Sequence, residues 1–469
     1  MQNRLTIRNA TSLSLLLRNV EYFDDSNSNN KKTFKVNFRG LRRANPANEY
    51  TLDGGVTLLG QYEVDTAIGP FSFANVAVSR TEDGQENAEC TQLVRLTLFT
   101  EGSIGKWQIA LPSITHSETA PVVVRTTSDL LYGIYFSDWS LALFTNVVPN
   151  DWMRRLPDTL PLSALSIPGT HNSPAYHKAL PSVRCQAVSI LDQLNNGIRF
   201  LDVRVQVDSP SDQGTDELTL VHGNFGVARS GSRKFRDLYS EILSFLQRNP
   251  SETIIMSLKR EGTGSAHDSH LAQRLYSHYI TDGNWVLSRG IPTLGAARGK
   301  IVLFRRFKLS EELRQQYGCM SGINASQWAD NSPNSPGGDV HIQDLYEVSE
   351  SDDVEQKIEY VKKHCARAVM QLSSQSVAII HEDERSQRRM FVNFLSASNF
   401  WKPGYWPEKI AAMVNPAVTR FLCERHGTEY GAMCPAGLLV CDFVGERGDW
   451  SLVKVIVGMN ERLMQQEAP

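Results

Sequence analysis

Over the first 148 residues, hydrophobic positions come in short runs that turn residues such as Asp-Gly, Gly-Ser and Asn-Ser separate. The runs are rich in Val, Leu, Thr and aromatic residues without helical periodicity between them, a pattern typical of an antiparallel β-sandwich. The pattern therefore predicts an N-terminal all-β sandwich over residues 1–148. Its sequence shows no recognisable group of catalytic residues, so we expect an accessory domain of unknown role. We expect its strands at residues 4–10, 13–23, 32–38, 55–64, 71–80, 92–99, 106–114, 121–127 and 132–138.

From residue 149 to residue 469 the pattern changes, because short apolar runs now alternate with amphipathic stretches of helical period such as 234–250 and 354–372. Alternation of strands and helices predicts parallel strands joined by crossovers, and eight such strands favour closure into an α/β barrel of the TIM type. The expected strands are 162–167, 198–205, 218–223, 253–259, 300–307, 340–346, 391–398 and 438–445.

Composition supports a multidomain globular protein, with 469 residues of which 41% are hydrophobic and 21% charged. A net charge of -3 argues against a nucleic-acid binder. The seven cysteines are odd in number and scattered, so neither a disulfide framework nor a zinc motif is indicated. Neither a signal peptide nor a transmembrane run is recognised. We expect a cytoplasmic or peripheral membrane protein, and secretion stays open.

Polar residues stand where the predicted barrel strands end. Asp202 and Arg204 are two positions apart, so on a strand they point to the same face. Buried charges are costly unless each has a partner or a function, and barrel enzymes place their chemistry at the C-terminal strand ends. We expect one shared functional site, with separate structural ion pairs as the alternative. The strand-end residues are His171, Asp202, Arg204, His222, Lys259, Arg306, Asp344, Tyr346 and Asp442.

Several motifs along residues 155–450 resemble the bacterial-type phosphatidylinositol-specific phospholipase C family, within the X-domain-like phosphodiesterases. The resemblance implies a distorted TIM barrel and a lyase reaction. In that reaction the inositol 2-hydroxyl attacks the lipid phosphodiester and releases diacylglycerol and a cyclic inositol phosphate. The motifs, in order, are "LSIPGTHNS", "NGIRFLDVRV", "LVHGNF", "NPSETIIMSLKRE", "ARGKIVLFRRF" and "IQDLY".

The same resemblance assigns the roles that this chemistry needs. His171 matches the general base, Asp442 the carboxylate that orients it, and His222 the general acid. Arg204, beside Asp202, matches the cation that contacts the phosphoryl oxygens.

Metal use depends on which side chains surround the phosphate. A guanidinium stands where calcium-dependent relatives carry acidic ligands, so we expect a site that needs no metal and no cofactor. Asn172 departs from the Asp that many members carry, and its amide supports the acid or the arginine less strongly. Since the calcium-dependent branch uses an Asn here as a ligand, metal use stays an alternative.

Inositol-binding positions are matched by Lys259, Arg306, Asp344 and Tyr346, with Arg305 as an alternative to Arg306. A membrane contact is expected at Trp401, Tyr405 and Trp406, because such rings favour the bilayer interface. A hydrophobic cluster under a loop is the alternative interpretation of these aromatic residues.

The expected partner is phosphatidylinositol or a related head group at a membrane surface. Three other functions stay open from the sequence: a glycerophosphodiester phosphodiesterase, an enzyme for a glycosylphosphatidylinositol anchor or another phosphodiester, and a non-catalytic lipid- or glycan-binding protein.

Overall fold

The computed structural model describes residues 4–24, 57–77, 92–100, 106–112, 121–127, 130–280, 283–317, 321–373, 388–425 and 435–464. The expected strand at 32–38 lies outside these residues. By contacts the chain divides into two compact units. The first is Met1–Val147 with Thr419–Met433 and Arg447–Ser451, and the second is Val148–Val418 with Cys434–Glu446 and Leu452–Pro469.

The first unit contains two β-sheets in its described residues. The five-stranded sheet has the order β4-β1-β9-β8-β7, and the four-stranded sheet has the order β3-β2-β5-β6. Strand β9 was not predicted, and it pairs with β1 in parallel, unlike the antiparallel pairing expected throughout. The strands are β1 (Arg4–Asn9), β2 (Leu15–Asp24), β3 (Thr57–Ile68), β4 (Phe73–Ala77), β5 (Gln92–Thr100), β6 (Lys106–Leu111), β7 (Val122–Arg125), β8 (Leu131–Phe136) and β9 (Ser140–Thr145).

Both sheets contribute to one hydrophobic cluster. Ile7 and Leu141 of the five-stranded sheet and Leu17 and Leu96 of the four-stranded sheet are fully buried in it. Along β1, buried positions alternate with more exposed ones, as a strand with one face toward an apolar interior requires. The alternation along β1 therefore corresponds to one buried face, whereas β8 and β9 of the same sheet are buried at every position.

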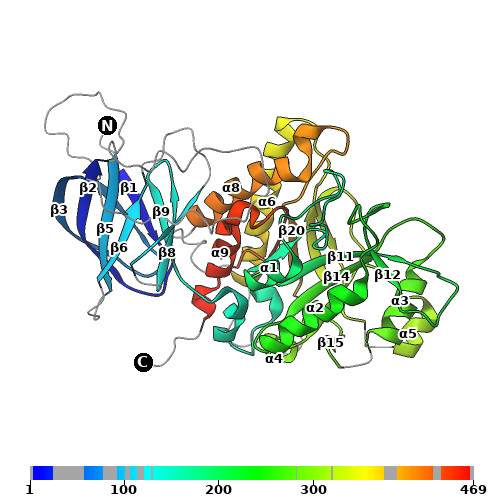
Figure 1. Cartoon of the computed structure of the whole chain (residues 1–469). Helices are drawn as coiled ribbons and strands as arrows, with labels where there is room; N and C mark the ends of the chain where they lie inside the picture. The colour runs from blue at the N-terminus through cyan, green and yellow to red at the C-terminus, as the bar shows by residue number, and fades with distance from the viewer. Residues whose placement is uncertain are drawn as a thin grey trace. The chain divides into compact units, whose positions relative to one another are not determined.

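The second unit is built on a curled sheet that includes β11, β14 and β20 (Figure 1). Its seven central strands are parallel, in the order β16-β14-β11-β10-β21-β20-β19. Most of their residues are buried, which explains why the sequence shows continuous apolar runs here. These strands are β10 (Ile167–Thr170), β11 (Phe200–Val207), β14 (Ile254–Arg260), β16 (Ile301–Arg305), β19 (Val340–Asp344), β20 (Met390–Phe394) and β21 (Leu438–Cys441). Shorter strands extend the sheet: β15 (Trp285–Val286), β17 (Ile323–Asn324) and β18 (Ser332–Gly337).

The prediction of eight parallel strands was wrong in the position of one strand and in the direction of another. The expected strand 162–167 overlaps β10 only at Ile167, because Leu162–Ala164 form a 3-10 helix. β12 (Leu218–His222) runs antiparallel to β11 and forms a hairpin with β13 (Phe225–Gly226). The connection of residues 208–217 is shorter than the dozen or so residues that a parallel crossover needs. Within the described part of the chain, no ladder joins β16 or β17 to β18 or β19, so the sheet curls without closing completely.

Helices occupy the connections between the parallel strands, and two of them match the expected amphipathic stretches, α2 (Phe235–Arg248) and α6 (Ser351–Ser373). None of the described helices is long and apolar enough to cross a bilayer. The other α-helices described are α1 (Ile190–Asn195), α3 (Asp268–His278), α4 (Leu294–Ala297), α5 (Glu311–Tyr317), α8 (Pro407–Arg425) and α9 (Ser451–Gly458).

Candidate active site

His171 and Asp442 lie side by side because they follow two neighbouring parallel strands. Thr170, the last residue of β10, is in register with Cys441, the last residue of β21. The next residue of each strand therefore reaches the same edge, and Nδ1 of His171 lies 2.9 Å from Oδ1 of Asp442. Burial raises the pKa of Asp442, and the neighbouring imidazole opposes this rise. The pair has the geometry of a carboxylate that orients an imidazole.

Gln186 holds these two strand ends together, and the sequence reasoning missed it. Its buried Nε2 donates to the backbone oxygen of His171 at 2.7 Å and to that of Cys441 at 3.0 Å. Gln186 lies in the connection between β10 and α1, where no strand pattern distinguishes it. Only the folded chain reveals this contact.

His222 faces His171 from the antiparallel strand β12. The two ring centroids are 5.6 Å apart, and the ring planes are nearly perpendicular at 84°. Nδ1 of His222 lies 2.9 Å from the backbone oxygen of Val183. Burial, Arg204 and His171 together lower the pKa of His222 to about 3. The ring is therefore neutral when no anion lies beside it, and an anion next to the ring favours its protonation.

Asp202 forms ion pairs with two arginines, Arg204 and Arg306. Oδ2 accepts from Nη2 of Arg204 at 3.1 Å, and Oδ1 accepts from Nη1 of Arg306 at 3.0 Å. Burial disfavours the Asp202 carboxylate, yet the two guanidinium groups outweigh burial and hold its pKa well below the usual range. Asp202 is therefore ionised, and it fixes both cations.

Glu261 is a second carboxylate of the site that sequence reasoning missed. Its Oε1 is 3.2 Å from Nη1 of Arg204 and 2.7 Å from Nζ of Lys259, and its Oε2 accepts from the backbone N–H of Gly223 at 2.8 Å. Burial opposes its ionisation, but Arg204 and Lys259 lower its pKa to about 2. Lys259 lies in β14 and Glu261 directly follows that strand, two positions later, so the sequence could have predicted that both side chains point to the same face.

Arg306, and not Arg305, faces this site. Its guanidinium lies 3.8 Å from the ring centroid of Trp328 and pairs with Asp202. Arg305 instead donates to the backbone oxygens of Ser321 and Phe307 and is buried away from Asp202. Arg305 ends β16 and Arg306 follows it. Because successive side chains along an extended chain point to opposite faces, only one of the two arginines can face the site.

Asp344 and Tyr346, the two other residues predicted to bind the head group, have different surroundings in the structure. Burial raises the pKa of Asp344, the last residue of β19, and Arg306 and Arg204 oppose this rise, so its carboxyl belongs to the same group of charges. The hydroxyl of Tyr346 donates to Asp330 at 3.0 Å.

Asn172 differs from what the sequence suggested. Its side chain is fully buried, and in the described residues neither of its amide atoms has a hydrogen-bond partner. The expectation that the amide supports His222 or Arg204 was therefore wrong. The φ of Asn172 is 37°, a left-handed backbone that Asn tolerates, and its N–H instead donates to Oδ2 of Asp202 at 3.2 Å.

Three aromatic residues were predicted at a membrane contact, and they are not equally exposed. Trp401 is 84% exposed, whereas Trp406 is half-buried and its Nε1 donates to the backbone oxygen of Phe400 at 3.2 Å. Tyr405 is half-buried too. Two exposed rings were missed: Phe400 contacts Trp401 and stacks on Phe225 of the β12–β13 hairpin, with ring centroids 5.9 Å apart. Phe225, Phe400 and Trp401 therefore form an exposed aromatic cluster beside the strand that carries His222.

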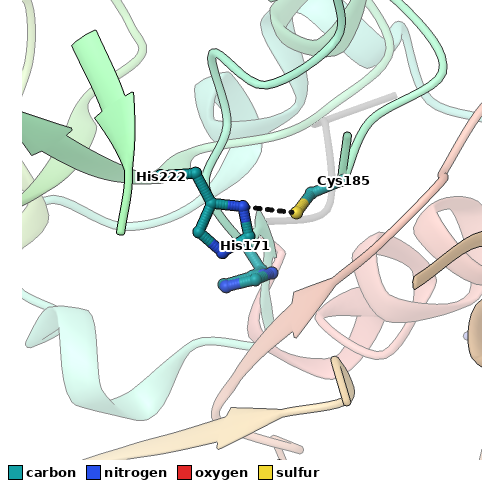
Figure 2. A group of neighbouring side chains, drawn as sticks. All are labelled: His171, Cys185 and His222. Carbon is teal, nitrogen blue, oxygen red and sulfur yellow. Dashed lines mark hydrogen bonds between the residues drawn. The ribbon is translucent and has the colours of Figure 1, made fainter. Parts of the chain in front are cut away.

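A thiol also reaches the two histidines. Among the described residues, His171, Cys185 and His222 form a group whose possible metal-ligand atoms all lie within 4.8 Å of one another (Figure 2). Cysteine and histidine are ligands of zinc-like ions. The cysteine pattern in the sequence gave no indication of this arrangement, because the three residues are brought together by separate segments.

Comparisons with known proteins agree with the resemblance in the motifs. Residues 159–307 match the family described as phosphatidylinositol-specific phospholipase C, X domain. A 1-phosphatidylinositol phosphodiesterase of Listeria monocytogenes is 26% identical over 331 residues, which cover 68% of this chain and 88% of that protein. A protein of the same name from Staphylococcus aureus is 25% identical over 313 residues, covering 63% of this chain and 89% of its own.

A solved structure shows the same fold. It is a double mutant of the phosphatidylinositol-specific phospholipase C from S. aureus, with a TM-score of 0.51 and 24% identity over 66% of this chain and 97% of that one. The second unit thus has a TIM-barrel-like phospholipase fold, as predicted. Residues 159–307 thus match the phosphatidylinositol-specific phospholipase C X domain, and the chain shows homology to the bacterial 1-phosphatidylinositol phosphodiesterases.

Proposed function

We propose that this protein is a phosphatidylinositol-specific phospholipase C that needs no metal. In the proposed reaction the inositol 2-hydroxyl attacks phosphorus, and diacylglycerol and a cyclic inositol phosphate leave. One observation carries the proposal: the His171–Asp442 pair faces His222, and the ring centroids of the two histidines are 5.6 Å apart. This spacing leaves one phosphodiester group within reach of a base and an acid.

His171 is the proposed base. Its Nδ1–H donates to Asp442, which leaves the lone pair of Nε2 to take the proton of the attacking hydroxyl. His222 is the proposed acid, with Nδ1 held by Val183 and Nε2 available to protonate the leaving oxygen of diacylglycerol. The negative phosphate raises the proton affinity of His222 when the lipid binds.

Arg204 is the proposed cation for the phosphoryl oxygens. Asp202 and Glu261 each bind one side of its guanidinium and so fix its position before the substrate arrives. Fixed positive charge where negative charge develops stabilises the transition state. With Asn172 in place of a carboxylate, Glu261 and Asp202 are the groups that hold Arg204.

The use of the carboxylate oxygens supports the proposed metal independence. Calcium needs six to eight oxygen ligands, whereas each Asp202 oxygen already accepts from a guanidinium. Arg204 and Arg306 supply the positive charge in its place. The buried amide of Asn172 offers a single oxygen, which is too few to bind calcium by itself.

Head-group and membrane contacts complete the proposal. Lys259, Arg306, Asp344 and Tyr346 are the proposed contacts to the inositol ring, and Lys259 is 38% exposed toward solvent. Trp401 is the foremost membrane contact, with Tyr405 and Trp406 supporting its loop. We also propose that the two sheets of the first unit form a β-sandwich accessory domain over residues 1–148, joined to a catalytic domain over residues 149–469.

The test is incubation with phosphatidylinositol vesicles in excess EDTA, with 31P NMR of the water-soluble products. We expect cyclic inositol phosphate, and His171→Ala and His222→Ala each lowering turnover by about 10²- to 10⁴-fold. His278→Gln is the matched control, because Nε2 of His278 contacts the backbone oxygen of Gln213 outside the site. A need for calcium would contradict the role of Arg204. Vesicle binding without released diacylglycerol would identify a lipid-binding protein instead.

A further inference from the structure

Cys185 lies against the proposed acid, and the proposed mechanism does not use it. Its side chain is fully buried, and its Sγ is 3.6 Å from Nδ1 of His222. His171 follows β10, Cys185 lies in the connection to α1, and His222 ends β12, so three segments converge on one point (Figure 2). Cys185 therefore adds a third side chain that could bind a metal ion to the two histidines.

We propose that His171, Cys185 and His222 form an inhibitory site for a zinc-like divalent cation. The ligand atoms lie within 4.8 Å of one another. One zinc ion with Zn–N of about 2.0–2.1 Å and Zn–S of about 2.3 Å places tetrahedral ligands about 3.4–3.6 Å apart. Side-chain torsions that close the cluster by about 1 Å are therefore enough, and the fourth position is left for water.

The neighbours of the histidines already orient them for this ligation. Asp442 occupies Nδ1 of His171, and the backbone oxygen of Val183 occupies Nδ1 of His222. The Nε2 atom of each ring therefore keeps its lone pair. A carboxylate behind a ligating histidine is a common arrangement at zinc sites, because it fixes the tautomer and makes the nitrogen a better ligand.

Charge and ligand type select the class of ion. Burial has the largest effect on the pKa of the Cys185 thiol and raises it. The carboxylates of Asp442, Asp202 and Glu261 raise this pKa further and the guanidinium of Arg204 lowers it, so the charges that act on the sulfur are mostly negative. A dication gains from this field, and the thiol releases its proton to solvent as the metal–sulfur bond forms. Sulfur and imidazole favour Zn²⁺, Cd²⁺ and Co²⁺, whereas Ca²⁺ and Mg²⁺ prefer oxygen.

A metal ion bound at this site would block both proposed proton-transfer groups, His171 and His222, at once. A metal on Nε2 of His171 takes the lone pair of the base, and the same ion on His222 prevents this ring from delivering a proton. The inhibition rests on the proposed function, whereas the metal site itself does not. The binding measurement and the activity measurement can therefore fail separately.

The first experiment measures binding of the metal alone to the full chain. Calorimetric titration with ZnCl₂ is expected to give one zinc per chain, unaffected by excess Ca²⁺ or Mg²⁺. Cys185→Ser is expected to weaken binding by more than about tenfold, because losing even an outer partner of a ligand costs about 10- to 100-fold. With Co²⁺ the wild type should show a thiolate-to-metal charge-transfer band that Cys185→Ser lacks.

The matched control is Cys365→Ser, since the Cys365 thiol is also buried but accepts from Asn393, between α6 and β20 and outside the cluster. It should keep both the affinity and the cobalt band, and His222→Ala should lose both. Zinc binding that Cys185→Ser and His222→Ala leave unchanged would place the ion elsewhere and overturn the proposal.

The second experiment measures cleavage of phosphatidylinositol vesicles with ZnCl₂ and then EDTA. We expect zinc to inhibit the wild type reversibly, and the inhibition constant to rise more than about tenfold in Cys185→Ser. Activation by zinc would overturn the inhibitory role. If the protein binds zinc through the cluster but does not cleave the lipid with or without EDTA, the proposed function fails and the metal site stands.

Discussion

At the residue scale, two carboxylates organise the cations of the site. Asp202 binds Arg204 and Arg306, and Glu261 binds Arg204 and Lys259. A buried charge without a partner is unfavourable, so each of these ions depends on the others. The cations are thereby held in place before any phosphate arrives, which is what electrostatic catalysis requires.

Glu261 therefore contributes stability that depends on pH. Its pKa falls from 4.5 to about 2 in the folded chain, so the contribution is complete above about pH 4.5 and is lost as the pH falls toward 2. We expect Glu261→Gln to lower the free energy of unfolding most at neutral pH and progressively less in acid. Urea unfolding between about pH 3 and pH 7 measures this difference.

A surface carboxylate is the control for this pH series. Glu359 on α6 forms an exposed ion pair with Lys362, and such pairs contribute about 0–1 kcal/mol. Glu359→Gln should therefore change stability little at any pH. A destabilisation by Glu261→Gln that grows as the pH falls would contradict the assigned ion pairs.

At the element scale, the β12–β13 hairpin carries both the proposed acid, His222, and the exposed aromatic residue Phe225. β12 ends at His222, and Phe225 of β13 stacks on Phe400 from the loop after β20. The hairpin therefore connects the site to the exposed aromatic cluster of Phe225, Phe400 and Trp401. A membrane contact at this cluster would bring the lipid head group next to His222.

Trp401→Ala tests that contact without disturbing the interior, because the side chain is 84% exposed. We expect binding to phosphatidylinositol vesicles to weaken about tenfold, as loss of one buried aromatic ring predicts. The rate on a soluble, short-chain substrate should not change. Vesicle sedimentation and turnover measure the two effects.

Met370→Ala is the matched control, since Met370 is an exposed apolar residue at the opposite end of the strands. The neighbouring Gln371 contacts Arg389, which directly precedes β20. This variant should bind vesicles as the wild type does. Equal binding by Trp401→Ala and wild type would exclude Trp401 as a membrane contact.

At the scale of the whole molecule, a buried ion pair ties the amino-terminal ends of the strands together. Nε of Arg199, just before β11, donates to Glu252, just before β14, at 2.8 Å, and neither side chain is exposed. Arg199 also donates to the backbone oxygens of Leu194 and Pro149. This buried ion pair and the proposed active site thus lie at opposite ends of one sheet.

Glu252→Gln should destabilise the protein by about 3–5 kcal/mol, because it leaves the Arg199 charge buried without its partner. The activity of the protein that stays folded should not change. Urea unfolding measures the loss, and the double variant Arg199→Met/Glu252→Met should recover much of it, since apolar groups replace the pair. A loss below about 1 kcal/mol in the single variant would show that the pair is not needed.

The hydrophobic pattern was enough to predict most of the parallel strands and the polar residues at their ends, but it misplaced the first strand and gave β12 the wrong direction. Strand burial is a local property, and parallel strands bring their carboxyl ends to one edge. For that reason the order of residues along the chain was enough to predict one shared site at the strand ends, with Asp202 and Arg204 on one face, whereas the pairing of His171 with Asp442 was implied by the family resemblance.

Tertiary structure alone decided the contacts between segments distant in sequence. It set the direction of β12, the pairing of β9 with β1, and the choice of Arg306 over Arg305. It also brought Gln186 and Cys185 to the histidines and Glu261 to Arg204. The physical reason is that periodicity reports which face of an element is buried, whereas register and the path of a connection depend on packing against the rest of the chain.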